Sequence, residues 1–383
     1  MGDWQDVRDQ ILSRARRIVV KVGSAVLASE DGINSQVLEH LASQLSGLHD
    51  RGLEILLVSS GAVAAGRPVS QRLAGQGTTS LVQKQATAAI GQSRLMHAYD
   101  QAFACFGKVT AQILLTRDDL RSRERFLNAR NTLTTLLGWK AIPIMNENDT
   151  VAVQELKFGD NDSLAALILN TVEADLFINL TSARGVFDDN PLLNPDACLL
   201  PCVENIGDLQ IDTLCRGKTC AGTGGMESKL RAARRAAQLS VATVIAPGKE
   251  PFVLEKIFAG KQLGTWVMPE TKPVARRKFW LAYNLDPKGS LIIDAGAKEA
   301  LLKKGKSLLP AGILQVDGRF GVGALVRILD EHGHVLGVGL CNYTQAELKK
   351  VLGKKSEEVR GILGGIAHFE AVHRDNMLLD VAL

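Results

Sequence analysis

The sequence predicts an α/β protein in which a mostly parallel sheet lies between helices, followed by a small, mainly β domain. Apolar runs of strand length alternate with helical segments over about 250 residues, the arrangement that parallel sheets require. The alternation breaks at a segment with three prolines and a basic run, and short apolar runs separated by glycine turns follow it. We therefore expect a larger domain at 14–265, a linker at 266–287 and a smaller domain at 288–383.

The composition excludes several function classes. The 383 residues carry 45 Lys and Arg against 41 Asp and Glu, which gives no strong nucleic-acid footprint. No apolar run reaches ~18 residues and the first residues lack the pattern of a signal peptide, so we expect a soluble, cytoplasmic protein with no membrane partner. Four of the six cysteines, Cys198, Cys202, Cys215 and Cys220, have spacings looser than those of zinc knuckles, and reduced thiols are favoured over a metal site.

The first buried strand is expected in RIVVKVGS, where β-branched residues surround Lys21. A lysine at the end of a buried parallel strand is costly unless an anion meets it there, and ligands of open α/β sheets bind at the carboxyl ends of strands. A lysine stem that reaches out to solvent is the alternative. The run therefore marks one side of a candidate anion site.

A second strand, at 54–58, runs into a turn at the start of a helix rich in small residues. Ser60 and the backbone amide of Gly61 could bind a carboxylate or phosphate at this helix end. Helices are also expected over 35–50 and 81–105, and a strand over 109–115. The arginines after that strand alternate with acids, which is typical of a paired, solvated surface or a subunit contact.

Polar residues gather after the next strand, AIPIMNENDTVA, and before the apolar helix of FGDNDSLAALILN. Capping explains any one of them, but five carboxylate or amide side chains within about seventeen residues exceed what capping requires. These side chains are Asn146, Asp149, Asp160, Asn161 and Asp162. They predict a polar ligand site.

A glycine-rich loop, GTGGMESK, spans 222–229 and follows a further strand at 175–180. Its glycines can bring bare N–H groups close to an anion, and the helix expected from about Ser228 points its positive end at the same place. Lys229 adds a full charge. A flexible surface turn is the alternative for a lone loop of this kind. A strand at 241–246 and a helix ending near residue 259 complete the alternation.

Five motifs, KVGS, SSGAVAAG, NENDTVA, FGDND and GTGGMESK, resemble in residues and order the glutamate 5-kinases of the amino acid kinase family. The C-terminal part resembles the PUA domain appended to them. This resemblance implies an amino acid kinase fold and transfer of phosphate from ATP to the γ-carboxylate of L-glutamate, the first step of proline biosynthesis. It also implies Mg²⁺ held mainly by the nucleotide phosphates, proline as a feedback inhibitor, and a homodimer or tetramer.

The resemblance assigns roles to residues of this sequence. Lys21 and Lys229 match the lysines that contact the phosphates, and Asp162 matches the aspartate that orients them. The expected substrate-binding positions are Ser60, Gly61, Asn146, Asp149, Asp160 and Asn161. The expected ATP-binding positions are Lys21, Thr181, Ser182, Thr223, Gly224, Gly225, Met226, Glu227, Ser228 and Lys229. The family usually has Thr-Asp where this chain has Thr181-Ser182, and no residue is expected to be a metal ligand.

The residue types suit this chemistry. A substrate carboxylate with a pKa near ~4.3 is already ionised at neutral pH, so it needs no general base. The obstacle is repulsion between the carboxylate and an anionic phosphate. Lysines and Mg²⁺ lower that barrier by placing positive charge where negative charge gathers.

Two alternatives stay open. A relative that phosphorylates aspartate, acetylglutamate, carbamate or UMP would share the lysines and the glycine loop. An RNA-binding or RNA-modifying protein is the second, because PUA domains occur in such enzymes. RNA binding is disfavoured, since residues 288–383 carry 13 Lys and Arg against 11 Asp and Glu, and a structural or regulatory role for this domain is favoured.

Overall fold

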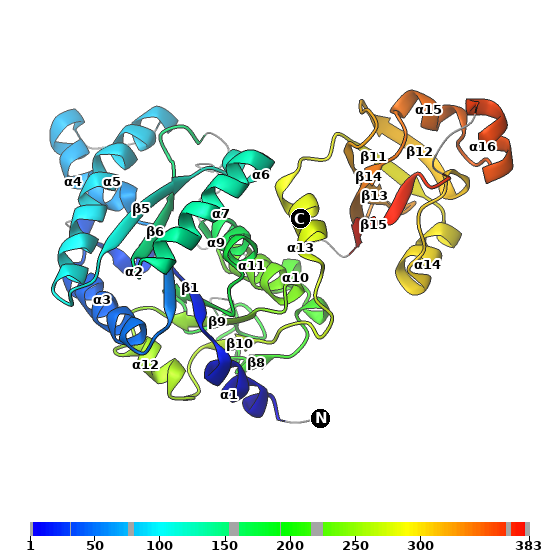
Figure 1. Ribbon diagram of the computed structural model, residues 1–383. Coiled ribbons are helices and arrows are strands. Elements are labelled where there is room, and N and C mark those ends of the chain that lie inside the picture. Colours follow the sequence, from blue (N-terminus) through cyan, green and yellow to red (C-terminus); the bar gives the residue numbers. More distant parts are fainter. Residues whose placement is uncertain are drawn as a thin grey trace. The chain divides into compact units, whose positions relative to one another are not determined.

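The computed structural model describes residues 3–30, 32–75, 80–152, 161–191, 193–215, 225–364 and 369–379. The chain divides into two compact units, Met1–Pro273 and Val274–Leu383 (Figure 1). Within the described ranges, no helix is long and apolar enough to cross a membrane.

The first unit is built on an eight-stranded sheet with the order β5-β6-β4-β1-β7-β9-β10-β8. All neighbouring strands are parallel except β9 and β10, so the prediction of a mostly parallel sheet is confirmed. The strands are β1 Arg17–Val22, β4 Glu54–Ser59, β5 Thr110–Leu115, β6 Ile142–Glu147, β7 Leu176–Thr181, β8 Cys202–Val203, β9 Ala242–Pro247 and β10 Thr265–Val267. A separate two-stranded pair joins β2 Ala28–Ser29 to β3 Gly32–Ile33.

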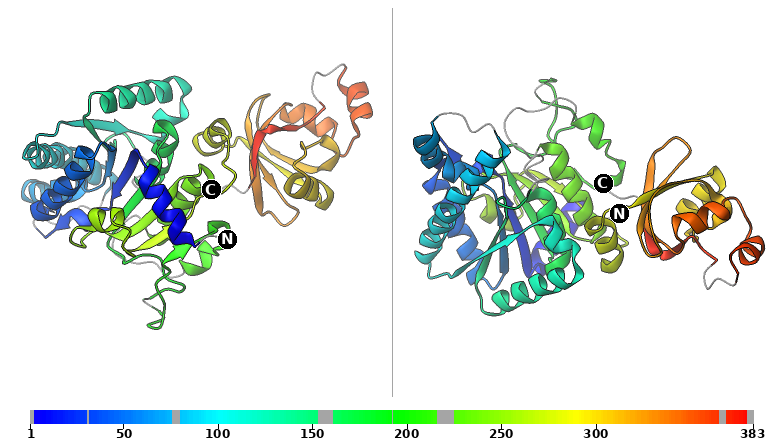
Figure 2. Two further views of the ribbon diagram at one scale, coloured as in Figure 1. Left: turned by 60° about the horizontal axis from the view of Figure 1, so that its bottom comes forward. Right: turned by 90° about the horizontal axis from the view of Figure 1, so that it is seen from above.

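Helices cover both faces of this sheet (Figure 2). They are α1 Trp4–Arg14, α2 Ser24–Leu27, α3 Ser35–Asp50, α4 Ala62–Ala74, α5 Leu81–Ala104, α6 Arg117–Arg121, α7 Arg123–Gly138, α9 Asn161–Val172, α10 Ile211–Leu214, α11 Met226–Gln238 and α12 Val253–Phe258, with a 3₁₀ turn at Ile206–Asp208. Asn34, Ser80 and Ser122 cap the starts of α3, α5 and α7 through their side chains, which explains why these helices begin where they do.

The alternation of side chains along β1 sorts its residues between the two faces. Ile18, Val20 and Val22 belong to the apolar core formed with α3 and α5. Because successive side chains of a strand point to opposite faces, Val19 and Lys21 lie on the other side of the sheet. That side is the one on which α9 packs against β1 and β4.

The second unit holds a five-stranded sheet with the order β12-β11-β13-β14-β15, and only β11 and β13 are parallel neighbours. Its strands are β11 Gly289–Ile293, β12 Ile313–Gly318, β13 Leu325–Leu329, β14 Val335–Cys341 and β15 Val372–Leu379. Its helices are α13 Arg276–Asn284, α14 Ala295–Lys304, α15 Gln345–Lys350 and α16 Ser356–Leu363, with a 3₁₀ turn at Pro310–Gly312. The expected mainly β domain is confirmed.

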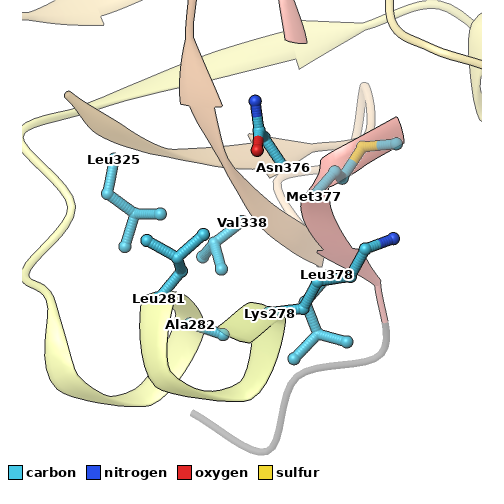
Figure 3. Close-up of a pocket in the computed structure, with 8 residues that line it drawn as sticks. All are labelled: Lys278, Leu281, Ala282, Leu325, Val338, Asn376, Met377 and Leu378. Atoms are coloured by element: carbon cyan, nitrogen blue, oxygen red, sulfur yellow. The ribbon is translucent and has the colours of Figure 1, made fainter. Parts of the chain in front are cut away.

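Helix α13 lies in the segment 266–287 and packs on the sheet of the second unit. Leu281 and Ala282 face Leu325 and Val338 of the sheet (Figure 3). The Nζ of Lys278 also donates a hydrogen bond of 2.8 Å to the carbonyl of Arg374. The segment expected as a linker thus contains this helix and two residues of β10.

Candidate active site

Lys21 lies one residue before the carboxyl end of β1, between two parallel neighbours. It pairs with Val58 of β4 and Asn179 of β7, and its side chain is only 4% exposed. Its Nζ lies 2.7 Å from Oδ1 of Asp162. The Nδ2 of Asn179 donates to the same oxygen at 2.9 Å. Neighbouring strands therefore present a lysine and an amide to one buried carboxylate.

The other oxygen of Asp162 is bound from helix α11. Lys229 places its Nζ 3.2 Å from Oδ2, and the hydroxyl of Ser228 donates to Oδ2 at 2.7 Å. Lys229 is 5% exposed and Asp162 is fully buried. The first turns of α9 and α11 thus meet over the end of β1, and the structure brings Lys21, Lys229 and Asp162 together.

The charges of these groups depend on one another. Burial by itself raises the pKa of the Asp162 carboxyl, because a carboxylate loses its hydration in the interior. The ammonium groups of Lys21 and Lys229 outweigh this effect and hold the pKa of Asp162 well below its usual range. The carboxylate therefore stays ionised at neutral pH and holds two cationic tips at one point.

Beside this triad, amide and hydroxyl groups form a second polar cluster. Asn161 donates from Nδ2 to Oγ of Ser60 at 2.8 Å and to Oδ1 of Asn146 at 2.9 Å. Asn146 in turn donates to Oε1 of Gln92 at 2.9 Å. Three of the expected substrate-binding residues, from β6, α9 and the turn after β4, therefore touch one another.

Asp149 and Gly61 lie at the ends of the same two strands. Asp149 follows β6 in a turn and is partly buried, and burial raises its pKa to about 6. Gly61 precedes α4 with φ at 117°, a left-handed conformation that favours glycine. Asp160, the remaining expected substrate position, lies outside the described residues.

The described residues of the expected nucleotide-binding stretches lie at the carboxyl end of β7 and at the start of α11. Thr181 is buried and its carbonyl accepts a hydrogen bond of 2.7 Å from the N–H of Gly248, whereas Ser182 is exposed. Gly225 precedes α11, which begins two residues earlier than predicted, so that Met226, Glu227 and Ser228 lie in its first turn. Thr223 and Gly224 lie outside the described residues.

Residues 16–246 match the amino acid kinase family, and residues 289–363 match the PUA domain. The chain belongs to the amino acid kinase family. It is 57% identical to "Glutamate 5-kinase" of Oleidesulfovibrio alaskensis, with 100% of each chain covered. It is 60% identical to the protein of that name from Maridesulfovibrio salexigens, covering 98% of this chain and 99% of the relative, and 47% identical to that from Geobacter sulfurreducens, covering 97% and 100%. The resemblance seen in the five motifs is confirmed, and the protein is a kinase.

Three residues at this candidate site were not foreseen. Asn179 lies in a predicted strand and donates to Asp162. An amide inside an apolar run was the one sign in the sequence that could have marked it as a site residue. Gln92 lies on α5, whose sequence gives no sign of a site contact. Tyr99, on the same helix, is fully buried and its hydroxyl lies 2.8 Å from Oγ of Ser59, which in turn donates to the carbonyl of Ser60 at 3.0 Å.

Three of the four spaced cysteines lie within the described residues. None of Cys198, Cys202 and Cys215 is in a disulfide bond, and burial raises the pKa of Cys202 to about 12. Cys220 lies outside the described residues. Across the described ranges, no group of three His, Cys, Asp or Glu side chains is placed to hold a metal ion.

Proposed function

We propose that this kinase transfers the γ-phosphoryl group of ATP to the γ-carboxylate of L-glutamate, which gives L-glutamyl 5-phosphate for proline biosynthesis. The observation that carries the proposal is the convergence of Lys21 and Lys229 on the buried Asp162, at the carboxyl end of β1. The relatives named glutamate 5-kinase, 57% and 60% identical over nearly the whole chain, support the choice of substrate.

The proposed mechanism needs no proton abstraction. The substrate carboxylate is ionised at neutral pH and attacks the γ-phosphorus while the bond to the leaving ADP oxygen breaks. Lys21 and Lys229 stabilise the negative charge on the transferring group, and Asp162 keeps both ammonium groups in position. ATP binds over the Thr181-Ser182 end of β7 and the start of α11. Glutamate binds on the side of Ser60, Asn146, Asp149 and Asn161.

Mg²⁺ is the metal that this reaction class implies. Asp162 is the acid that both lysines contact, and each of its oxygens already accepts two donors, from Lys21 and Asn179 or from Lys229 and Ser228. It does not fit as a metal ligand in this arrangement. We therefore assign Mg²⁺ to the nucleotide phosphates, where it would reduce the charge of the ATP.

The experiment is a hydroxylamine trap, which converts an acyl phosphate to a coloured hydroxamate. Purified enzyme with ATP and Mg²⁺ is tested with glutamate, aspartate, N-acetylglutamate and carbamate in turn, with ADP release measured in parallel. We expect hydroxamate with glutamate alone. ADP release with another acceptor and none with glutamate would contradict the proposal and favour a different member of the family.

Proline inhibition and self-association belong to the same proposal, because proline is the end product of the pathway that this reaction would begin. Adding proline to the hydroxamate assay should lower the rate, and light scattering should give the mass of a dimer or tetramer. For the PUA domain we propose a structural or regulatory role. Salt-sensitive tRNA binding at submicromolar concentration would contradict it.

A further inference from the structure

The amide cluster beside the lysines includes one residue that no motif marks. Gln92, on α5, accepts a hydrogen bond through Oε1 from Nδ2 of Asn146. Asn146 receives one through Oδ1 from Nδ2 of Asn161, which also donates to Ser60. The cluster is thus a continuous chain of amides from α5 through β6 to α9 and the turn after β4.

A backbone group determines which way each amide points. The N–H of Glu147 donates to Oδ1 of Asn146 at 2.9 Å, so this atom must be the oxygen and its partner atom the NH₂. Since the NH₂ of Asn146 can only donate, Gln92 must present its oxygen to it. Since Oδ1 of Asn146 can only accept, Asn161 must present its NH₂. The orientation of all three side chains follows from one peptide N–H.

This orientation leaves one atom unpaired at each end. Nε2 of Gln92, a donor, and Oδ1 of Asn161, an acceptor, are both buried and have no hydrogen-bond partner within the described part of the chain. Buried polar atoms without partners are rare, and each calls for a ligand or another specific reason. The side chain of Asn161 is 8% exposed, so the cost of leaving its oxygen unpaired is not relieved by bulk water.

The two atoms have the polarity of an amino-acid head group. A donor suits a carboxylate and an acceptor suits an ammonium. Asn161 and Asp162 are consecutive residues in the first turn of α9, one in the amide chain and the other between the lysines. A substrate whose head group lies at the amides therefore has its far carboxylate at the lysines. The amides lie at the ends of β6 and β4 and Lys21 lies on β1, so the two groups are one to two strand spacings of ~4.8 Å apart.

We infer that Gln92 is a specificity-determining residue: its Nε2 donates to the α-carboxylate of the amino-acid substrate while Oδ1 of Asn161 accepts from the α-ammonium. This inference rests on the proposed function and adds a contact to it. Gln92 distinguishes a free α-carboxylate from an uncharged group at the same place. The α-amide of glutamate, isoglutamine, keeps the γ-carboxylate that reacts and changes only the group that faces Gln92.

The test is the ratio of kcat/KM for glutamate to kcat/KM for isoglutamine. In Gln92→Glu the donor becomes an anionic acceptor, which repels an α-carboxylate and accepts from an α-amide. We expect the ratio to fall about 100-fold, with KM for glutamate raised about 10- to 100-fold and KM for ATP changed less than twofold. Gln92→Met, which has no donor, should lower the ratio by a smaller factor of about 10.

Gln101→Glu is the matched control, because Gln101 is exposed on the same helix and undergoes the same change of charge. Its ratio should equal that of the wild type. Equal losses with glutamate and isoglutamine in both Gln92 variants would mean that Gln92 only supports the fold of the cluster, and unchanged KM for glutamate would mean that it makes no contact. Either result overturns the inference. A wild-type enzyme inactive with glutamate would instead contradict the proposed function.

Discussion

Lys21 and Asp162 form a buried ion pair, with Nζ and Oδ1 2.7 Å apart. Their side chains are 4% and 0% exposed, so each is the other's partner in place of water. Breaking such a pair from one side leaves an uncompensated charge in the interior. Here the acid keeps a second cationic partner, Lys229, so loss of either lysine leaves a neutralised carboxylate. The arrangement tolerates removal of one lysine far better than removal of the acid.

Lys21→Ala should therefore lower turnover without unfolding the protein. We expect kcat to fall by about 10²- to 10³-fold, because one charge at the transferring phosphate is lost. Lys229→Ala should fall in the same range. ADP release gives the rate and circular dichroism the fold, and Lys249→Ala, on the turn after β9, is the control. Near-normal turnover in either variant would rule out the assigned role.

Asp162→Asn should lower both turnover and stability. The variant leaves two buried ammonium groups without their carboxylate, and we expect a loss of about 3–5 kcal/mol in the free energy of unfolding. Asp118→Asn breaks an exposed ion pair with Arg121 and should cost less than about 1 kcal/mol. Urea denaturation compares the two. Equal losses would show that the buried carboxylate adds nothing beyond a surface pair.

The same variant predicts a pH dependence. The pKa of Asp162 is lowered in the folded state, so its carboxylate adds stability above the unfolded pKa of ~3.9, and this stability is lost as the pH falls below that value. The difference in unfolding free energy between the wild type and Asp162→Asn should thus be constant from about pH 5 to 8 and narrow below about pH 4. A difference that widens with acid would contradict the assigned pKa direction.

The sequence could predict what depends on local pattern. Lys21 stands out because it interrupts an apolar strand, and Lys229 because it follows a glycine loop, so both were found before any geometry was known. The strands and helices of the first unit follow from the same periodicities. The pKa of Asp149, by contrast, is raised because the turn after β6 is partly buried. The burial of a turn cannot be read from the local sequence.

Gln92 and Tyr99 could not be predicted because their role depends on how α4 crosses α5. The two helices contact through Gly66 and Gly91, where an added Cβ would overlap the carbonyl oxygens of Thr87 and Ala62. Helix α5, held at this close distance from α4, contacts the ends of β4 and β6 through Tyr99 and Gln92. Such long-range packing is not encoded in the spacing of polar residues along a single helix.

Asp149 predicts a second pH effect, on substrate affinity. If its carboxylate binds the substrate ammonium, it must be ionised, and burial raises its pKa to about 6. KM for glutamate should therefore rise as the pH falls below about 6, by about tenfold per unit, whereas an ordinary aspartate would show this only near ~4. Asp149→Asn should have a high KM that does not vary over this range. A wild-type KM that is flat from pH 5 to 7 would exclude the role.

The α4–α5 contact predicts that Gly66→Ala disturbs the substrate side of the site more than the nucleotide side. The added methyl group must push α5 away from α4, with a cost of about 1–3 kcal/mol, and α5 carries Gln92 and Tyr99. We expect the unfolding free energy to fall and KM for glutamate to rise several-fold while KM for ATP stays within about twofold.

Gly138→Ala is the matched control, because Gly138 lies in helix α7 with nothing within 4 Å of an added Cβ. That change should stabilise the protein by about 0.4–1 kcal/mol and leave both KM values unaltered. A Gly66→Ala variant as stable as Gly138→Ala, with an unchanged KM for glutamate, would show that the helix crossing does not position the substrate site.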